Sequence, residues 1–211
     1  WNTYHYLTSN PQIGFKNQIP INSEPLKDNI AIDFTTLKFF SDLEKEKEIS
    51  FDKKFIISST LYSILKNDQI NEVESLKSPL SLYIMNGEVI PIFNDKDFKN
   101  KITEDYTRLL DFIKCKCDKI TVIEKAELLN QYDVSHTLNP LMHYLIDNSI
   151  IANKPNNLLI TLDSSSLKLF PADTINVIHP VDYLRMILVD HEFEKVLQYC
   201  KEKNIEIKHG I

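Results

Sequence analysis

The sequence has little glycine, cysteine and arginine, and each shortage narrows the range of functions. Three glycines in 211 residues leave no phosphate-cradling loop to propose, and no GxSxG nucleophile elbow is present. Cys115, Cys117 and Cys200 are an odd number without framework spacing, which favours the cytoplasm over an oxidising compartment. Because Cys115-x-Cys117 lacks a second pair, we expect no zinc site.

Long apolar runs and excess positive charge are also missing. The longest apolar candidates, such as residues 184–189, are far shorter than the ~20 residues that cross a bilayer, so we expect no membrane partner. The formal net charge of −6 argues against broad attraction to nucleic acid. Arg108 and Arg185 are the only arginines, so RNA binding would depend on local lysines.

The length of the chain suits one principal domain, because 211 residues with 43% hydrophobic content are enough for one sizeable core. Residues 1–28 are rich in Asn and Pro without a clean period, and they predict an extended arm or linker. Residues 29–211 predict the folded domain. Since the chain opens at Trp1 without a secretion signal, we expect a piece of a longer polypeptide whose other domains are partners.

Short apolar runs alternate with helical patterns through the predicted domain. This alternation predicts an α/β fold: a three-layer sandwich with a mainly parallel central sheet flanked by helices. Residues 81–93 interrupt the alternation, because two β-rich arms around Asn86-Gly87 predict an inserted β-hairpin, within an insertion at about 79–118. We predict strands at 29–33, 54–58, 119–123, 158–162, 176–178 and 205–207, and helices at 35–45, after 58, and at 95–118, 126–130, 137–150, 164–170 and 180–203.

Two aspartates follow predicted strands directly, Asp33 after NIAI and Asp163 after LLITL. In open parallel sheets, ligands bind at the carboxyl ends of the strands. Carboxylates that gather there are suited to Mg²⁺ or Mn²⁺, which can activate water at a phosphodiester. An aspartate in this position is also a common N-cap for the next helix, so both interpretations stay open.

Four segments, IAIDFTTLKFF, FIISSTLYSIL, LLITLDSSSLKLF and NVIHPVDYL, resemble in their order the PIN-like (PilT N-terminus type) nuclease domains. They are most similar to diverged variants appended to large bacterial repeat-containing proteins, over about residues 29–188. The resemblance implies single-stranded RNA as the substrate and three or four acids that share one or two Mg²⁺ or Mn²⁺ ions. Asp33 and Asp163 match two of these acids and would be the catalytic metal ligands.

The remaining acids of the family pattern are not found where the resemblance places them. Ser63 stands at the position of the second acid, and Asn139 stands at the start of the helix before LLITL. A neutral side chain gives a hard dication neither full charge nor a base that activates water. Asp133, Asp147 or Glu127 could supply a relocated carboxylate, or could be plain surface charges.

His136 and His143 are seven residues apart, so they share one helix face, and Asp147 is one turn further on. The face could bind a metal or could be a structural polar stripe.

Two functions remain in view. The chain is either a PIN-like, Mg²⁺- or Mn²⁺-dependent endoribonuclease with an incomplete acidic site, or a catalytically inactive PIN-like interaction or regulatory module.

Overall fold

The computed structural model describes residues 29–75, 77, 80–85, 88–93, 96–122, 140–162 and 177–205. The predicted arm at 1–28 lies outside these residues. So do the predicted helices at 126–130 and 164–170 and the strand predicted at 205–207, apart from Ile205.

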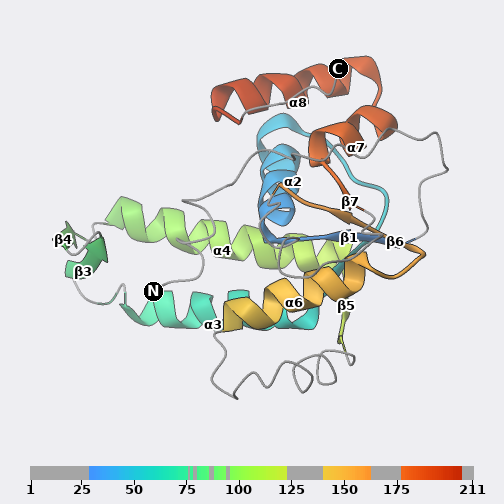
Figure 1. Ribbon diagram of the computed structural model, residues 1–211. Coiled ribbons are helices and arrows are strands. Elements are labelled where there is room, and N and C mark those ends of the chain that lie inside the picture. The colour runs from blue at the N-terminus through green and yellow to red at the C-terminus, as the bar shows by residue number, and fades with distance from the viewer. Residues whose placement is uncertain are drawn as a thin grey trace.

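A five-stranded parallel sheet forms the centre of the molecule, with the order β5-β2-β1-β6-β7 (Figure 1). Its middle strand β1 pairs with β6 along its whole length, from Asn29 opposite Asn157 to Ile32 opposite Ile160. The other neighbour of β1 is β2. The prediction of a mainly parallel sheet is therefore confirmed. The strands are β1 (Asn29–Ile32), β2 (Phe55–Ser58), β5 (Cys117–Ile120), β6 (Asn157–Ile160) and β7 (Val177–Ile178).

Apolar residues on both faces of the sheet explain its two covering layers. Ile30 and Ile32 belong to the large core cluster, whereas Ala31 between them belongs to a smaller cluster with Leu159. Side chains alternate between the faces of a strand, so a strand that is apolar throughout must be covered twice. Six helices flank the described sheet: α2 (Phe34–Lys47), α3 (Ser59–Ser75), α4 (Lys96–Lys116), α6 (Pro140–Ala152), α7 (Pro180–Ile187) and α8 (Asp190–Glu202).

The predicted hairpin is confirmed. Strand β3 (Leu80–Met85) pairs antiparallel with β4 (Glu88–Phe93), and Met85 lies opposite Glu88 across the two intervening residues. The hairpin lies at the outer ends of α3 and α4, away from the five-stranded sheet (Figure 1). Helix α4 by contrast contributes Tyr106 and Phe112 to the main core.

Several predicted boundaries are wrong; the strand predicted at 158–162, for example, ends at Ile160, and two other differences affect the packing. The residues predicted as one helix at 180–203 form α7 and α8, because Leu188 and Val189 have extended backbones. A continuous helix of about 24 residues would be about 36 Å long, whereas the break lets α7 bury Tyr183 in the core while α8 packs Tyr199 against α2. The predicted strand at 119–123 instead begins at Cys117, whose side chain is buried in the core.

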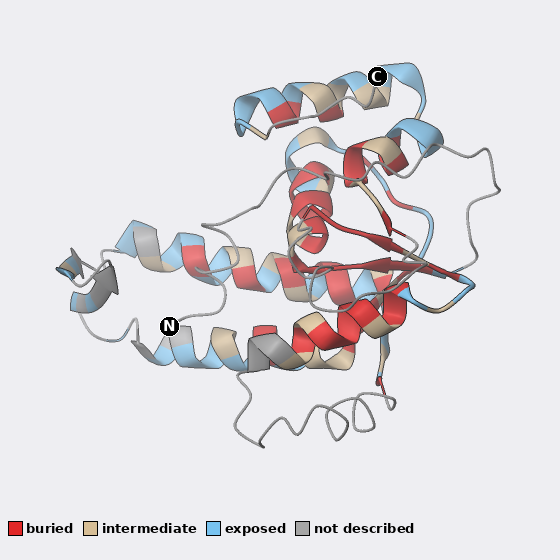
Figure 2. Ribbon diagram, in the orientation of Figure 1, coloured by how far each residue is buried: buried red, intermediate tan, exposed pale blue. Residues whose placement is uncertain are grey.

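Buried residues concentrate on the sheet and on the helix faces that cover it (Figure 2). In the part of the chain that is described, no helix has the combination of length and apolar content that a membrane crossing requires.

Candidate functional site

Asp33 lies at the carboxyl end of the central strand β1, and its side chain caps helix α2. Its Oδ1 accepts a hydrogen bond from the backbone N–H of Thr36 at 2.8 Å. The backbone of Asp33 is extended and its carbonyl accepts the N–H of Leu37 at 2.8 Å. These are the features of an N-cap aspartate, which satisfies N–H groups that the first turn of a helix leaves free.

Threonine hydroxyls surround the rest of this carboxylate. Thr35 Oγ1 lies 2.9 Å from Oδ1 and 2.8 Å from Oδ2, and Thr161 Oγ1, next to the end of β6, donates to Oδ2 at 2.5 Å. The backbone N–H of Leu162 donates to Thr35 Oγ1 at 3.3 Å. The carboxylate therefore connects the start of α2 with the end of the neighbouring strand.

The environment of Asp33 is almost free of water, because only 2% of the residue is exposed. Burial raises the pKa of Asp33 from 3.8 to about 6, and the hydrogen bonds from Thr161, Thr36 and Thr35 act in the opposite direction. The raised pKa follows from desolvation, since the charged form loses its hydration shell and no cation among the described residues replaces it.

Asp163 lies outside the described residues, so the expected gathering of Asp33 and Asp163 at the strand ends stays a prediction. The strands that precede the two aspartates are adjacent and parallel, and Ile32 is opposite Ile160. Leu162, which directly precedes Asp163 in the chain, is hydrogen-bonded to Thr35.

A second buried carboxylate, Asp147 of α6, binds the end of β2. Ser58 Oγ donates to Asp147 Oδ2 at 2.8 Å and accepts the N–H of Leu61 at 3.1 Å, so it caps α3. Both Ser58 and Asp147 are buried. The surface-charge interpretation of Asp147 is therefore wrong, because a short apolar helix packed on the sheet turns this residue inward. One turn earlier, Tyr144 Oη accepts the N–H of Phe34 at 2.6 Å.

The other sequence candidates do not join this region in the described structure. Ser63 is exposed, and its hydroxyl donates to the carbonyl of Ser59 at 2.9 Å within α3. His143 is half-buried on α6. Asn139, Asp133, Glu127 and His136 lie outside the described residues.

The described residues do not fit a Mg²⁺ or Mn²⁺ ion. A carboxylate has about four lone-pair positions, and three donors already contact Asp33: the N–H of Thr36 and the hydroxyls of Thr35 and Thr161. An ion at this buried carboxylate would have to compete with these donors. Within the described ranges, no three His, Cys, Asp or Glu side chains gather where they could hold a metal.

Sequence reasoning missed a buried ionic cluster around Asp42, further along α2. Asp42 Oδ1 lies 2.7 Å from Arg108 of α4, and its Oδ2 lies 2.9 Å from Lys38 and 2.8 Å from Tyr199 of α8. The position could have been noticed, because Asp42 interrupts the apolar stripe of Phe39 and Leu43. A charge on a buried stripe needs a partner on the neighbouring element.

A groove of about 590 Å³ lies between α2 and α4, beside this cluster and not at the strand ends. Its acidic and basic side chains are mixed, so its charge selects no ligand of one sign. The lining residues are Ser41, Glu44, Lys45, Lys99, Asn100, Thr103, Glu104, Thr107, Arg108 and Asp111.

Comparison of the sequence and the fold with protein-family models, curated proteins and solved structures finds no match.

Proposed function

We propose that this chain is a diverged PIN-like domain of a larger bacterial protein, and that it is a catalytically inactive interaction or regulatory module. The observation that carries this proposal is the state of Asp33, the first of the two acids in the predicted site. Its carboxylate is buried, caps α2 and accepts three hydroxyl contacts. The Asp33 carboxylate therefore acts as a hydrogen-bond acceptor that stabilises the fold.

The neighbouring residues support the same role. Ser58 caps α3 with the help of Asp147, as Asp33 caps α2 with the help of Thr161. In both cases a polar side chain at a strand end orients the next helix and is held by an element distant in sequence. The polar edge of the sheet thus stabilises the fold, which is a sufficient reason for these residues to be polar.

Metal-dependent cleavage of single-stranded RNA remains the second candidate. It is favoured by the adjacency of the parallel strands β1 and β6, since these are the strands that precede Asp33 and Asp163 in the sequence. Ser63 weighs against it, since this exposed residue binds its own helix where the resemblance expects an acid.

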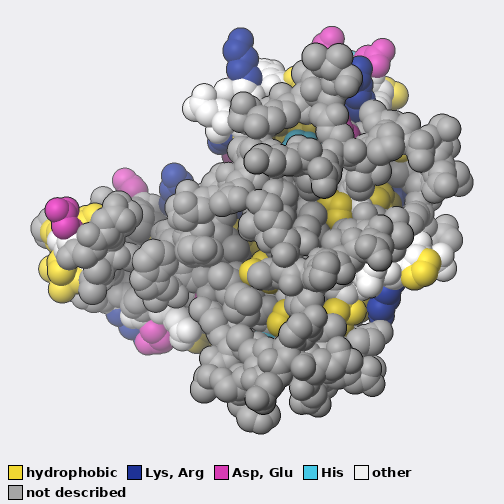
Figure 3. All heavy atoms as spheres, in the orientation of Figure 1, with side chains coloured by type: hydrophobic (Ala, Val, Ile, Leu, Met, Phe, Trp, Pro, Cys, Tyr) yellow, Lys and Arg dark blue, Asp and Glu magenta, His cyan; other side chains and the backbone are white. Residues whose placement is uncertain are grey.

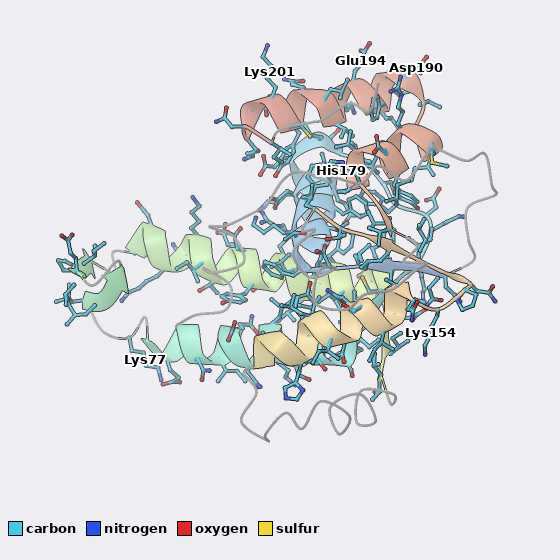
Figure 4. The ribbon with its side chains drawn as sticks, viewed as in Figure 1. Lys77, Lys154, His179, Asp190, Glu194 and Lys201 are labelled. Carbon is cyan, nitrogen blue, oxygen red and sulfur yellow. The ribbon has the colours of Figure 1, made fainter. Side chains whose placement is uncertain are left out.

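An RNA cleavage assay with increasing Mn²⁺ decides between the two. The variants are Asp33→Asn and Asp163→Asn, with Asp190→Asn as the control because Asp190 is exposed on α8 (Figure 4). We expect all four proteins, wild type included, to cleave no faster than a blank. Robust cutting that is lost in either test variant but kept in Asp190→Asn would overturn the proposal.

Thermal unfolding with Mn²⁺ gives a readout that does not require activity. A ligand that binds the folded state raises the midpoint of unfolding. We expect Mn²⁺ to leave the difference in midpoint between wild type and Asp33→Asn unchanged. If Mn²⁺ raised the midpoint of unfolding only in wild type and Asp190→Asn, Asp33 would be identified as a metal ligand.

A further inference from the structure

Helix α8 lies on the outside of the described fold and packs mainly on α2 and α7 (Figure 1). It buries three residues, Val196, Tyr199 and Cys200, whereas α2 buries eight. Glu194 and Lys201 lie on its exposed side. Elements with few buried apolar contacts separate from a folded core at a lower free energy than elements inside it. Helix α8 should therefore open more easily than α2.

A joint of two extended residues, Leu188 and Val189, connects α8 to α7. The N–H of Leu188 donates to the carbonyl of Leu184 at 2.9 Å, at the end of α7. The carbonyl of Val189 accepts the N–H of Phe193 at 3.0 Å, at the start of α8. Because each of these bonds stays within one helix, a rotation at the joint moves α8 without breaking either helix. Protein hinges are short segments of this kind at the ends of elements.

Ion pairs hold the far end of α8 against α2. Lys47 Nζ of α2 lies 2.8 Å from Glu202 Oε2. Just beyond α8, Lys203 Nζ lies 3.0 Å from Glu46 Oε2. Apart from that of Lys47, these side chains are 36–45% exposed, and Figure 3 shows side chains of both charges where α8 lies. Since salt screens exposed charges, the strength of these contacts depends on the solution around the protein.

Separation of α8 from α2 would uncover Phe39 and Asp42. The ring of Phe39 lies 5.7 Å from that of Tyr199, between centroids, and Tyr199 Oη donates to Asp42 Oδ2 at 2.8 Å. When Tyr199 leaves, Asp42 keeps its ion pairs with Arg108 and Lys38. The separation therefore leaves no carboxylate without a cation at this position. It presents an apolar ring beside a compensated charge, a face that the closed state hides.

We propose that residues 190–205 form a movable lid on α2, which swings open about Leu188 and Val189 while the sheet and the other helices stay folded. The 13 residues of α8 place the ion pairs of Glu202 and Lys203 about 20 Å from the joint. At this distance from the joint they hold the lid shut with the greatest leverage. The lid therefore opens as one unit, and salt favours its open state.

Hydrogen exchange of the intact chain, measured residue by residue at low urea concentrations, tests the lid. We expect the amides of Val196, Tyr199 and Cys200 to share one free energy of opening and one small dependence on urea. They should exchange at least about tenfold faster than the amides of Phe40 and Leu43 in α2. From about 0.05 to 1 M NaCl, the ratio of the rates in α8 to those in α4 should rise about threefold to tenfold.

Two double variants separate the ion pairs of the lid from exposed ion pairs in general. Glu46→Gln with Glu202→Gln removes both carboxylates that hold the lid. Glu74→Gln with Asp118→Asn is the matched control, because it removes the carboxylates of two exposed pairs elsewhere. We expect the first variant to speed exchange in α8 about threefold to tenfold and to leave α4 unchanged. The control should leave α8 unchanged.

Three results would each overturn the lid. Exchange in α8 at the same free energy as in α4 would mean that α8 opens only when the whole domain unfolds. Protection that falls gradually from Val196 to Glu202 would mean that the helix end frays and does not move as a unit. Equal effects of the two double variants on α8 would mean that its ion pairs do not hold it shut. The lid does not rest on the inactive-module proposal, and none of these results would change the outcome of the RNA cleavage assay.

Discussion

Two buried carboxylates on α2 are held in contrasting ways. Asp33, the N-cap, is 2% exposed, and Asp42, in the second half of the helix, is 6% exposed. Among the described residues, Asp33 accepts from hydroxyls and a backbone N–H, whereas Asp42 contacts Arg108, Lys38 and Tyr199. The two carboxylates are thus buried to a similar extent, but different kinds of partner stabilise them.

The contrast shows that position at a strand end does not by itself make a carboxylate a metal ligand. A buried charge needs a cation, a metal or strong donors, and otherwise takes up a proton more readily. At Asp33 the protein supplies hydroxyls, and the pKa rises to about 6. At Asp42 it supplies cations, which tie α2 to α4 and, through Tyr199, to α8. Substitutions at single residues can break one side of this comparison at a time.

Removal of the Asp42 side chain should lower the stability of the fold more than any of the other changes. Asp42→Ala leaves Arg108 and Tyr199 without their shared acceptor, and losing one partner of a buried ion pair costs about 3–5 kcal/mol. Because 17% of the Arg108 side chain is exposed, we expect about 2–3 kcal/mol less stability in urea unfolding. Asp105→Ala is the control, since Asp105 also binds Arg108 but lies on the same helix. An equal loss in the two variants would show that Asp42 does not join the helices.

Asp33→Asn should change how stability depends on pH. The pKa rises from 3.8 to about 6 on folding, so between these values the folded state keeps a proton that the unfolded state has lost. Its stabilising contribution is complete below about pH 4 and is lost as the pH rises through about 6. Asparagine also caps helices well but does not titrate.

Relative to Asp33→Asn, wild type should therefore lose about 2–3 kcal/mol of stability between pH 4 and pH 7.5. Urea unfolding at several pH values measures this difference. A constant difference across the range would mean that burial does not penalise the Asp33 carboxylate.

Ser58→Ala extends the comparison to the second polar contact at the strand ends. The change removes the cap of α3 and leaves Asp147 Oδ2 without the Ser58 hydroxyl, so we expect a loss of about 1–2 kcal/mol. Ser63→Ala is the matched control, because Ser63 is exposed and bonded within its own helix, and it should change stability by less than about 0.5 kcal/mol. Chemical unfolding of both variants would reveal whether the buried contact of Ser58 contributes more to stability than the exposed contact of Ser63.

Removal of the His179 side chain should have the smallest effect on stability, and this effect should depend on pH in the opposite direction to that of Asp33. Its Nδ1 accepts the N–H of Val181 at 3.2 Å and caps α7 (Figure 4). Burial lowers the pKa of His179 below 6.5, so its stabilising contribution is present above pH 6.5 and is lost as the pH falls.

We expect His179→Ala to cost about 1 kcal/mol at pH 7.5 and less at pH 5. His191→Ala, at an exposed position on α8, should have little effect at either pH. A larger cost of His179→Ala at pH 5 than at pH 7.5 would contradict the cap.

Several features followed from local sequence patterns. The buried strands β1 and β6 are short apolar runs, and a helix begins directly after Asp33. Asn86-Gly87 between two β-rich arms predicted the hairpin pairing, and Pro140 is the first residue of α6, where proline is tolerated. Each of these signals acts over a few residues, so it can be seen without knowledge of the fold. The break at Leu188 and Val189 had no such signal, because it depends on two different packing surfaces.

The sequence by itself determined the α/β class, the hairpin and the placement of polar residues after β1 and β2. The tertiary structure alone decided what those residues do, because their partners come from distant segments. Thr161 is 128 residues from Asp33, and Asp147 is 89 residues from Ser58. Whether a carboxylate caps a helix, binds a cation or holds a proton depends on the donors and the water around it. That environment exists only when the chain has folded.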